Sequence, residues 1–384
     1  MKNPIIFFKD LVIRCYMHYL CKCFGFKPVR ANSWIKVLKN DYFGADSKLP
    51  LTKKQKHWLH KNGFAYNRWF MQNLREDNIH LFLSDFDYWR MMPLSNHFNR
   101  WIDDKLTLRY VLEPFKQYLP AYYCVITTTG NKVKLIDSPT DIKFDDDYFL
   151  HIVERYKILA MKPLSGAEGK GFIKYTYQDG EFFMNDIKMT ESEVRTFFKD
   201  VKDLLITEYV VQCKEHMKVC SMSSCTLRIN SIKEVGEKPY LMHSFARFGT
   251  KESGAVSNLM SGGVSIAYDS YTGYYADRFL HAKDYIAWYD EHPESHISLK
   301  GKQLPHWELI RDKLIEMHEF LGVIEYMAFD VIVTDDGFKI CEINSGPSVS
   351  YGQAMCYPIY SNEQTASFFN KRLKGPRRND SKKY

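Results

Sequence analysis

The feature that most constrains the fold is a pair of apolar, strand-like stretches near the end of the 384-residue chain, each interrupted by polar side chains. Asp330 stands inside the first stretch, and Glu342 and Asn344 stand in the second. Between them lies Asp335-Asp336-Gly337, a strong signal for a tight turn. The pattern predicts two antiparallel strands that bring the three side chains together. Glu342 and Asn344 should share one face, because side chains alternate along a strand.

These side chains offer two carboxylates and an amide oxygen. A carboxylate buried among apolar residues is costly unless it has a partner or a metal. Hard cations such as Mg²⁺ prefer oxygen ligands and often share them with nucleotide phosphates. We therefore expect a Mg²⁺ site at Asp330, Glu342 and Asn344. The alternative is solvent contact at the edge of a sheet.

A second polar segment, residues 162–171, lies between two strand-like stretches. It contains a serine and three glycines, so its backbone can turn tightly and direct N–H groups at phosphate oxygens. The spacing is not that of a Walker A loop, and the strand that follows excludes a dinucleotide-binding turn, which needs a helix there. A flexible hairpin loop would explain the glycines, but it explains less well why Lys162 ends the preceding strand.

Two further polar residues stand in strand-like stretches. Arg228 lies within residues 226–230, where a cation beside a metal–phosphate site can hold oxygens bidentately. Glu208 is the one carboxylate in the apolar stretch 205–211.

Hydrophobic periodicity and turn signals predict the other elements. Residues 25–100 are expected to be mostly helical and aromatic. Asp85 and Asp87 within them are read as caps or solvent-facing acids, or as part of a loop at a domain edge. Helices are predicted at 191–203 and 307–321, and strands at 156–161, 172–177, 181–184, 204–211, 226–232, 240–248, 327–333 and 338–343.

Taken in this order, the segments resemble the ATP-grasp superfamily over residues from about 100 to 370. The resemblance is closest to the branch associated with sugar transfer and surface-polysaccharide biosynthesis. The stretches that match are 102–106, 162–171, 226–228, 247–249, 256–258, 262–264, Asp330 and 342–344. No single stretch is specific, and the specificity comes from their order.

The resemblance implies an α+β fold in which two α+β lobes clamp ATP between antiparallel sheets. The expected division is a helical N-terminal region at 1–100, a first lobe with the phosphate loop at 101–205, and a second lobe with the metal site at 206–374. Residues 375–384 form a basic tail that is poor in hydrophobic residues, which predicts disorder.

The resemblance also implies roles for individual residues. ATP contacts are implied for Lys105, Lys162, Ser165, Gly166, Gly169, Lys170, Gly171, Glu208, Tyr209, Val210 and, as the ribose-binding acid, Glu215. One or two Mg²⁺ ions would be held by Asp330, Glu342 and Asn344. A catalytic role is implied for Arg228 at the γ-phosphate, and for Arg247 and Asn258, with the Gly262-Gly263 turn, at the acceptor. One departure is Glu168 inside the phosphate loop, where the family usually has a small or polar residue.

The activity implied is that of a carboxylate–amine ligase that uses ATP to make an acyl-phosphate. For this branch we expect amidation of a sugar acid with an amino acid or another amine, in capsular or surface polysaccharide biosynthesis. The alternatives are a kinase of a sugar or glycan intermediate, with His243 or Asp269 as weak candidates for its base, and a non-catalytic nucleotide-binding scaffold of a membrane glycan assembly.

The net charge of +7 bears on the partners. Residues 1–40 carry +7 and residues 371–384 carry +6, which leaves −6 on the body of the chain. A nucleic-acid-binding surface on the body is therefore not expected. The basic arms are typical of contact with an anionic membrane or glycan-assembly proteins, which places the protein in the cytoplasm, at the inner face of the membrane.

Residues 4–24 are apolar but contain charges too frequent for a membrane span or a signal peptide. Asp10, Arg14, His18 and Lys22 recur every four residues, which predicts one polar stripe on a helix. Such a helix can pack on its own domain or lie in a membrane interface. The nine cysteines show no zinc spacing and indicate reduced thiols.

Overall fold

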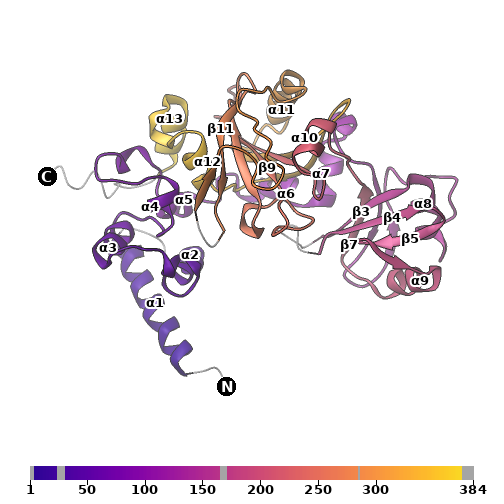
Figure 1. The fold of residues 1–384 in the computed structure, drawn as a ribbon, viewed down its shortest axis with the longest axis horizontal. Coiled ribbons are helices and arrows are strands. Elements are labelled where there is room, and N and C mark those ends of the chain that lie inside the picture. The colour runs from indigo at the N-terminus through magenta and orange to yellow at the C-terminus, as the bar shows by residue number, and fades with distance from the viewer. Residues whose placement is uncertain (1–3, 24–30, 165–170, 284–285, 374–384) are drawn as a thin grey trace.

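The computed structural model describes residues 4–23, 31–164, 171–283 and 286–373. A helical N-terminal region precedes two antiparallel sheets of seven strands each (Figure 1). The expected α+β class with two antiparallel sheets is therefore confirmed. The α-helices of the N-terminal region are α1 (Pro4–Cys23), α2 (Ala31–Phe43), α3 (Lys53–Lys61), α4 (Arg68–Met71) and α5 (Asp85–Met91).

The first sheet has the strand order β2-β1-β7-β3-β4-β5-β6. Its strands are β1 (Tyr122–Ile126), β2 (Lys132–Lys134), β3 (Ile158–Pro163), β4 (Ile173–Gln178), β5 (Glu181–Met184), β6 (Ile187–Met189) and β7 (Leu204–Glu208). The predicted hairpin is found as β4 and β5, with Gly180 at the turn in a left-handed conformation (φ +83°). Two helices, α8 (Tyr148–Tyr156) and α9 (Glu191–Asp200), share the core of this sheet, where Phe149 and Phe198 stack with ring centroids 3.9 Å apart.

The second sheet has the strand order β12-β11-β10-β9-β8-β13-β14. Its strands are β8 (Thr226–Ile232), β9 (Tyr240–Phe248), β10 (Val264–Tyr268), β11 (Tyr275–His281), β12 (Ala287–Tyr289), β13 (Tyr326–Thr334) and β14 (Gly337–Asn344). The predicted hairpin of two antiparallel strands is confirmed as β13 and β14. One face of β13, with Met327, Phe329, Val331 and Val333, belongs to the same core as α11 (Trp307–Phe320).

Residues 102–119 join the core of the second sheet, although the division made from the sequence places them with the first lobe. They include α6 (Arg100–Asp103) and α7 (Lys105–Val111), and the apolar side chains that they bury are Ile102, Leu108, Leu112, Phe115 and Leu119. These side chains pack there because α6 lies beside the edge strand β14. The first sheet itself spans residues 122–208, so β7 runs past the expected boundary at 205.

The N-terminal region packs on the second sheet from the side of α5. One apolar cluster joins α5 to β8, β9 and β13, to Val349 just before α12 (Ser350–Met355), and to α13 (Glu363–Arg372). The helix expected over residues 4–24 is found as α1, which packs on α2. In the described part of the chain, none of the helices combines the length and the apolar character needed to cross a membrane. The tail at 375–384 lies outside the described residues.

Candidate active site

A cavity of about 550 Å³ lies between the two sheets. Its walls come from β3 and β7 of the first sheet and from β8, β9, β13 and β14 of the second. The predicted site residues that line it are Lys105, Lys162, Glu208, Tyr209, Val210, Arg228, Arg247, Asn258, Asp330, Glu342 and Asn344. The fold therefore brings together residues that are up to 239 positions apart in the sequence.

The register of four strands explains why the polar side chains of the second sheet share one face. Asp330 on β13 lies opposite Glu342 on β14 and, on its other side, opposite Arg228 on β8. Residues directly opposite one another in antiparallel strands point to the same face of the sheet. Asn344 lies two residues from Glu342 on β14, so it shares the same face. Arg247 on β9 lies opposite Thr226, which is two residues from Arg228 on β8, so Arg247 shares that face as well.

Asp330 is the centre of this polar group. Arg228 Nη2 donates a hydrogen bond of 2.9 Å to Asp330 Oδ2, and Arg228 Nε lies 2.6 Å from Oδ1. Arg247 Nη2 lies 3.1 Å from the same Oδ1. Burial alone would raise the pKa of Asp330, but the two guanidinium groups hold it below its usual value. Asp330 is therefore an anion that holds two cations at the floor of the cavity.

The donor set at this floor fits a hard divalent cation. Asp330 Oδ1 is buried between the guanidinium groups of Arg228 and Arg247, and the side chain of Glu342 is 39% exposed and lines the cavity. Asn344 adds an amide oxygen, while its Nδ2 lies 3.5 Å from Asp330 Oδ2. Two carboxylates and one amide suit Mg²⁺, which accepts oxygen ligands and completes its shell with phosphate and water. No group of three His, Cys, Asp or Glu residues suited to a metal occurs among the described residues.

Lys105 reaches the cavity because its segment is fastened to the end of β14. Ser345 donates hydrogen bonds to Asp103 from its backbone N (2.8 Å) and its Oγ (2.6 Å). Asp104 then caps α7 by accepting a 2.6 Å hydrogen bond from Thr107 N. With the segment held in this way, Lys105 Nζ lies 3.6 Å from Glu342 Oε1.

The first sheet contributes the opposite wall. Lys162 lies on β3 opposite Leu205 on β7, and Glu208 is the last residue of β7. Glu208 Oε2 accepts a 3.0 Å hydrogen bond from Ala121 N, which fixes the carboxylate just before the linker that joins the two sheets. Tyr209 and Val210 begin this linker.

Two of the described site residues, Gly171 and Glu215, do not line the cavity, whereas Asn258 does. Glu215 lies exposed on α10 (Lys214–Val219) and does not line the cavity. Gly171 has φ +77°, and a Cβ added there would lie 2.7 Å from Pro163 Cγ. Asn258 lines the cavity, and its Oδ1 accepts a 3.0 Å hydrogen bond from Met260 N. The remaining loop residues, Ser165, Gly166, Glu168, Gly169 and Lys170, lie outside the described residues.

The two candidates for a kinase base lie away from the cavity. His243 is buried, bonds through Nε2 to the carbonyl oxygen of Tyr357 at 2.8 Å, and has a pKa lowered to about 4 by burial. Asp269 accepts hydrogen bonds from Tyr271 N and Thr272 N in a turn. Neither lines the cavity.

Sequence reasoning missed several residues that shape the site. Thr226 Oγ1 accepts a 3.0 Å hydrogen bond from Arg247 Nε and lies 2.9 Å from Ser257 Oγ, so it orients an arginine. Asp103, which holds the segment of Lys105 to the end of β14, and Thr226 both lie in stretches that match the family, but the sequence assigns neither a role. The period of two along β8 places Thr226 beside Arg228 on one face and could have identified it.

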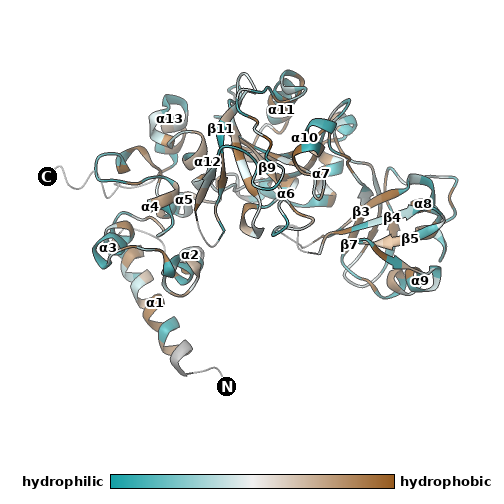
Figure 2. Cartoon of the chain, viewed as in Figure 1, coloured by the Kyte–Doolittle hydropathy of each residue, from teal (hydrophilic) through white to brown (hydrophobic). Residues whose placement is uncertain are grey.

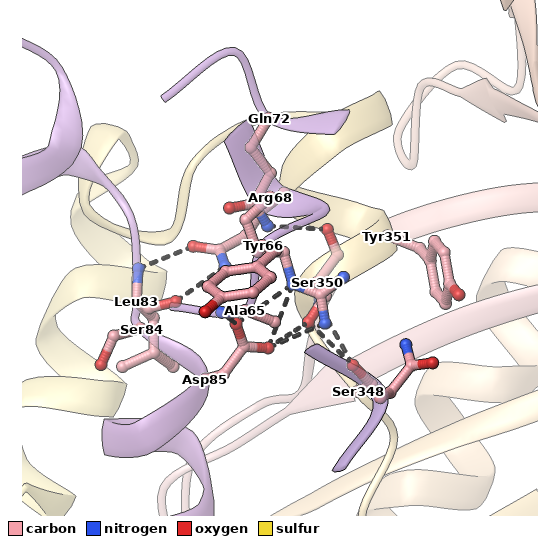
Figure 3. A network of polar contacts seen from close by, with 12 residues as sticks. Ala65, Tyr66, Arg68, Gln72, Leu83, Ser84, Asp85, Ser348, Ser350 and Tyr351 are labelled. Carbon is pink, nitrogen blue, oxygen red and sulfur yellow. Dashed lines mark hydrogen bonds and ion pairs between the residues drawn. The ribbon is translucent and has the colours of Figure 1, made fainter. Parts of the chain in front are cut away.

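A buried network fastens the chain just beyond Asn344 to the N-terminal region (Figure 3). Arg68 binds Asp85 through Nε (3.1 Å) and Nη2 (2.8 Å), and Asp85 Oδ1 accepts a 3.1 Å hydrogen bond from Ser350 Oγ. Gln72 Nε2 donates to the carbonyl oxygen of Ser350 at 3.0 Å. The N-terminal region therefore supports the segment that continues from the polar floor.

Residues 91–357 match the family model described as sugar-transfer associated ATP-grasp. No curated protein matches the chain.

Solved structures that are similar to the chain include the D-alanine–D-alanine ligase of Bacillus anthracis (14% identity, TM-score 0.36, covering 71% of this chain and 65% of that one). Another is an N5-carboxyaminoimidazole ribonucleotide synthetase in complex with ADP (12% identity, TM-score 0.35, covering 69% of this chain and 52% of that one). A third is the D-alanyl-alanine synthetase A of Vibrio cholerae (12% identity, TM-score 0.41, covering 72% of this chain and 66% of that one). The chain thus spans less than two thirds of the length of these three structures. Because the family model covers more than half of the sequence, the chain belongs to the sugar-transfer associated ATP-grasp family.

Proposed function

We propose that the protein is an ATP- and Mg²⁺-dependent carboxylate–amine ligase that works through an acyl-phosphate. The observation that supports this most is the cavity between the sheets, where a polar floor of two carboxylates, an amide and two arginines faces Lys162 and Glu208. Membership of the ATP-grasp family supports the same reaction class. In this proposal the acid substrate is a sugar acid, the amine is an amino acid or another amine, and the product belongs to a capsular or surface polysaccharide.

The residues would divide the work by charge. Asp330, Glu342 and Asn344 would hold Mg²⁺, which would neutralise charge on the phosphate oxygens. Lys105 and Lys162 lie on opposite walls and add positive charge to both sides of a triphosphate. Glu208, Tyr209 and Val210 sit at the linker, where an adenine ring would find a carboxylate and backbone groups.

Arg228 and Arg247 would lower the cost of bringing two anions together. A carboxylate oxygen of the acid attacks the γ-phosphorus of ATP, the bond to the bridging oxygen breaks, and ADP leaves. The amine nitrogen then attacks the acyl carbon, phosphate leaves with the electrons of its C–O bond, and the nitrogen loses a proton. Asp330 keeps both guanidinium groups aimed at the place where negative charge gathers.

The alternatives receive less support. A kinase needs a base near the γ-phosphate, and neither His243 nor Asp269 lines the cavity. A scaffold that only binds nucleotide has no need for the full set of Asp330, Glu342 and Asn344. We place the reaction in the cytoplasm, in keeping with nine free cysteines and a supply of ATP.

The test uses the full-length protein with Mg-ATP and a panel of sugar acids, first with hydroxylamine in place of the amine. An acyl-phosphate is trapped as a hydroxamate, which mass spectrometry detects together with ADP. Glu342→Ala should abolish hydroxamate formation and weaken Mg-ATP binding, and the exposed Glu237→Ala should leave both unchanged. A phosphate ester of the sugar that hydroxylamine does not cleave would instead support the kinase. Turnover by Glu342→Ala equal to that of the wild type would refute the metal assignment.

A further inference from the structure

The N-terminal helix α1 packs through one apolar face and exposes large apolar side chains on its other face. The inner face buries Ile13, Met17 and Leu20 against α2. On the outer face, large apolar side chains remain exposed: Phe7 (65%), Phe8 (66%), Leu11 (48%), Val12 (53%) and Tyr19 (61%). A helix turns about 100° per residue, which gathers these five on the side opposite the packed one.

The position of α1 makes this face accessible. Figure 1 shows the helix extending away from the two sheets, with its N-terminal end farthest from them. Hydrophobic and hydrophilic turns alternate along it in Figure 2. Soluble proteins rarely expose apolar side chains in one contiguous group of this kind unless the group binds something.

Basic side chains lie on the C-terminal half of the outer face. Arg14, His18 and Lys22 are exposed and follow one another at intervals of one helical turn. At about 100° per residue, His18 and Lys22 lie on the same side of the helix as Phe7 and Leu11, nearer its C-terminal end. The single acid of the helix, Asp10, is paired with Lys39 of α2 at 3.1 Å. The outer face therefore combines exposed apolar side chains with cations, and the one acid of the helix is neutralised.

We propose that α1 docks on an anionic lipid bilayer, lying in the plane of the surface. Phe7, Phe8, Leu11, Val12 and Tyr19 would enter the boundary between headgroups and acyl chains, as in interfacial amphipathic helices. Arg14 and Lys22 would contact anionic headgroups. The proposal stands apart from the proposed reaction, because it uses no residue of the cavity.

Charge favours a bilayer over a second copy of the chain. Two α1 helices packed through the same face about a twofold axis would cross near the middle of the helix. Arg14 lies near that middle, so the two copies would bring like charges together. An anionic surface turns the same residue into an attractive contact.

Docking would also orient the cavity. The network of Arg68, Asp85 and Ser350 joins the N-terminal region to the segment that follows β14 (Figure 3). A helix held on a bilayer would thus hold the second sheet at a fixed height above it. A membrane-bound acceptor could then approach the same face of the protein in every encounter.

The test is flotation of the intact protein with two kinds of vesicle. One contains phosphatidylcholine alone, and the other also contains about 30 mol% phosphatidylglycerol, which gives its surface a negative charge. We expect binding to the anionic vesicles only, and its loss in high salt. Phe8→Gln/Leu11→Gln should reduce the bound fraction at least about tenfold. The control Ile187→Gln/Val235→Gln, which changes two exposed apolar side chains elsewhere, should leave it unchanged.

A second pair of variants tests the cations of the outer face. Arg14→Gln/Lys22→Gln should weaken binding roughly 25-fold, about fivefold for each charge. Lys199→Gln/Lys202→Gln, exposed on the first lobe, should have no effect. Equal binding of the Arg14/Lys22 variant, or no binding of the wild type, overturns the proposal. It is also overturned if light scattering without vesicles shows a dimer that Phe8→Gln/Leu11→Gln dissociates. Hydroxylamine trapping in the absence of vesicles reports on the reaction separately.

Discussion

Asp330 shows how far sequence reasoning reaches for a single residue. A carboxylate inside an apolar strand needs a partner, and this argument correctly predicts that Asp330 is buried among polar neighbours. It does not predict that the partners include both Arg228 and Arg247. Those arginines lie on β8 and β9, and their register against β13 depends on long-range strand pairing that no local pattern encodes.

Replacing Asp330 with asparagine should strongly destabilise the fold. The substitution keeps the shape but leaves the guanidinium groups of Arg228 and Arg247, whose side chains are only 18% and 14% exposed, without their counter-charge. Removal of one partner from a buried ion pair costs about 3 kcal/mol. Urea unfolding should therefore show a free energy of unfolding lower by about that amount.

Asp290→Asn is a matched control for this substitution. Asp290 pairs with Arg278 on the surface, where both side chains are more than half exposed. Such pairs contribute about 0.5 kcal/mol, so the control should unfold nearly as the wild type does. Equal stability of Asp330→Asn and Asp290→Asn would show that the ion pairs at the cavity floor are not structural.

At the level of elements, local sequence signals predicted the hairpins but not the contacts between segments far apart in the sequence. The Asp335-Asp336-Gly337 turn gave the β13–β14 hairpin, and Gly180 gave the β4–β5 hairpin, because turn residues fix their neighbours. The reading of Asp85 was less successful. Its alternatives were a cap, a solvent-facing acid or part of a loop at a domain edge, yet it is buried in α5 and bonds to Arg68 and to Ser350, 265 positions away.

Asp85→Asn should loosen the contact between the N-terminal region and the segment that follows β14. The side chains of Arg68 and Asp85 are 12% and 6% exposed, so the loss of this charge leaves a buried guanidinium group unpaired. We expect a loss of about 3 kcal/mol of stability. Because the released segment begins directly after Asn344, we also expect weaker Mg-ATP binding in calorimetry, measured where the variant is still folded.

The exposed Asp77→Asn, in the same region, controls for a general effect of charge. A variant at Asp85 that loses stability but keeps full affinity for Mg-ATP would indicate that the network supports the N-terminal region alone.

For the whole molecule, charge was informative only once it was placed along the chain. Residues 1–40 carry +7 and residues 371–384 carry +6, against −6 on the body of the chain. The cations that line the cavity are the local Lys105, Lys162, Arg228 and Arg247. The order of motifs was enough to predict the family and two antiparallel sheets. It was not enough to place residues 102–119, because which core an amphipathic segment joins is decided by packing.

Three buried histidines make a further property of the whole molecule predictable, namely the dependence of its stability on pH. Burial lowers the pKa of His216 and His243 to about 4 and that of His318 to about 3. In the unfolded chain a histidine has a pKa near 6.5 (about the model-peptide value). Below that pH the unfolded chain binds protons that the folded chain excludes, so the free energy of unfolding falls as the pH drops.

The expected loss between pH 7.5 and 5.5 is roughly 1.4 kcal/mol for each histidine, or about 4 kcal/mol for the three. Asp46 acts in the opposite direction, since burial raises its pKa to about 6 and the folded chain then binds the extra proton, but it offsets only part of the loss. Urea unfolding at pH 7.5, 6.5 and 5.5 and constant ionic strength measures the difference. His216→Gln should remove about a third of the pH-dependent loss, because its side chain does not titrate in either state. A free energy of unfolding that stays constant or rises toward pH 5.5 would mean that these histidines are protonated in the folded protein.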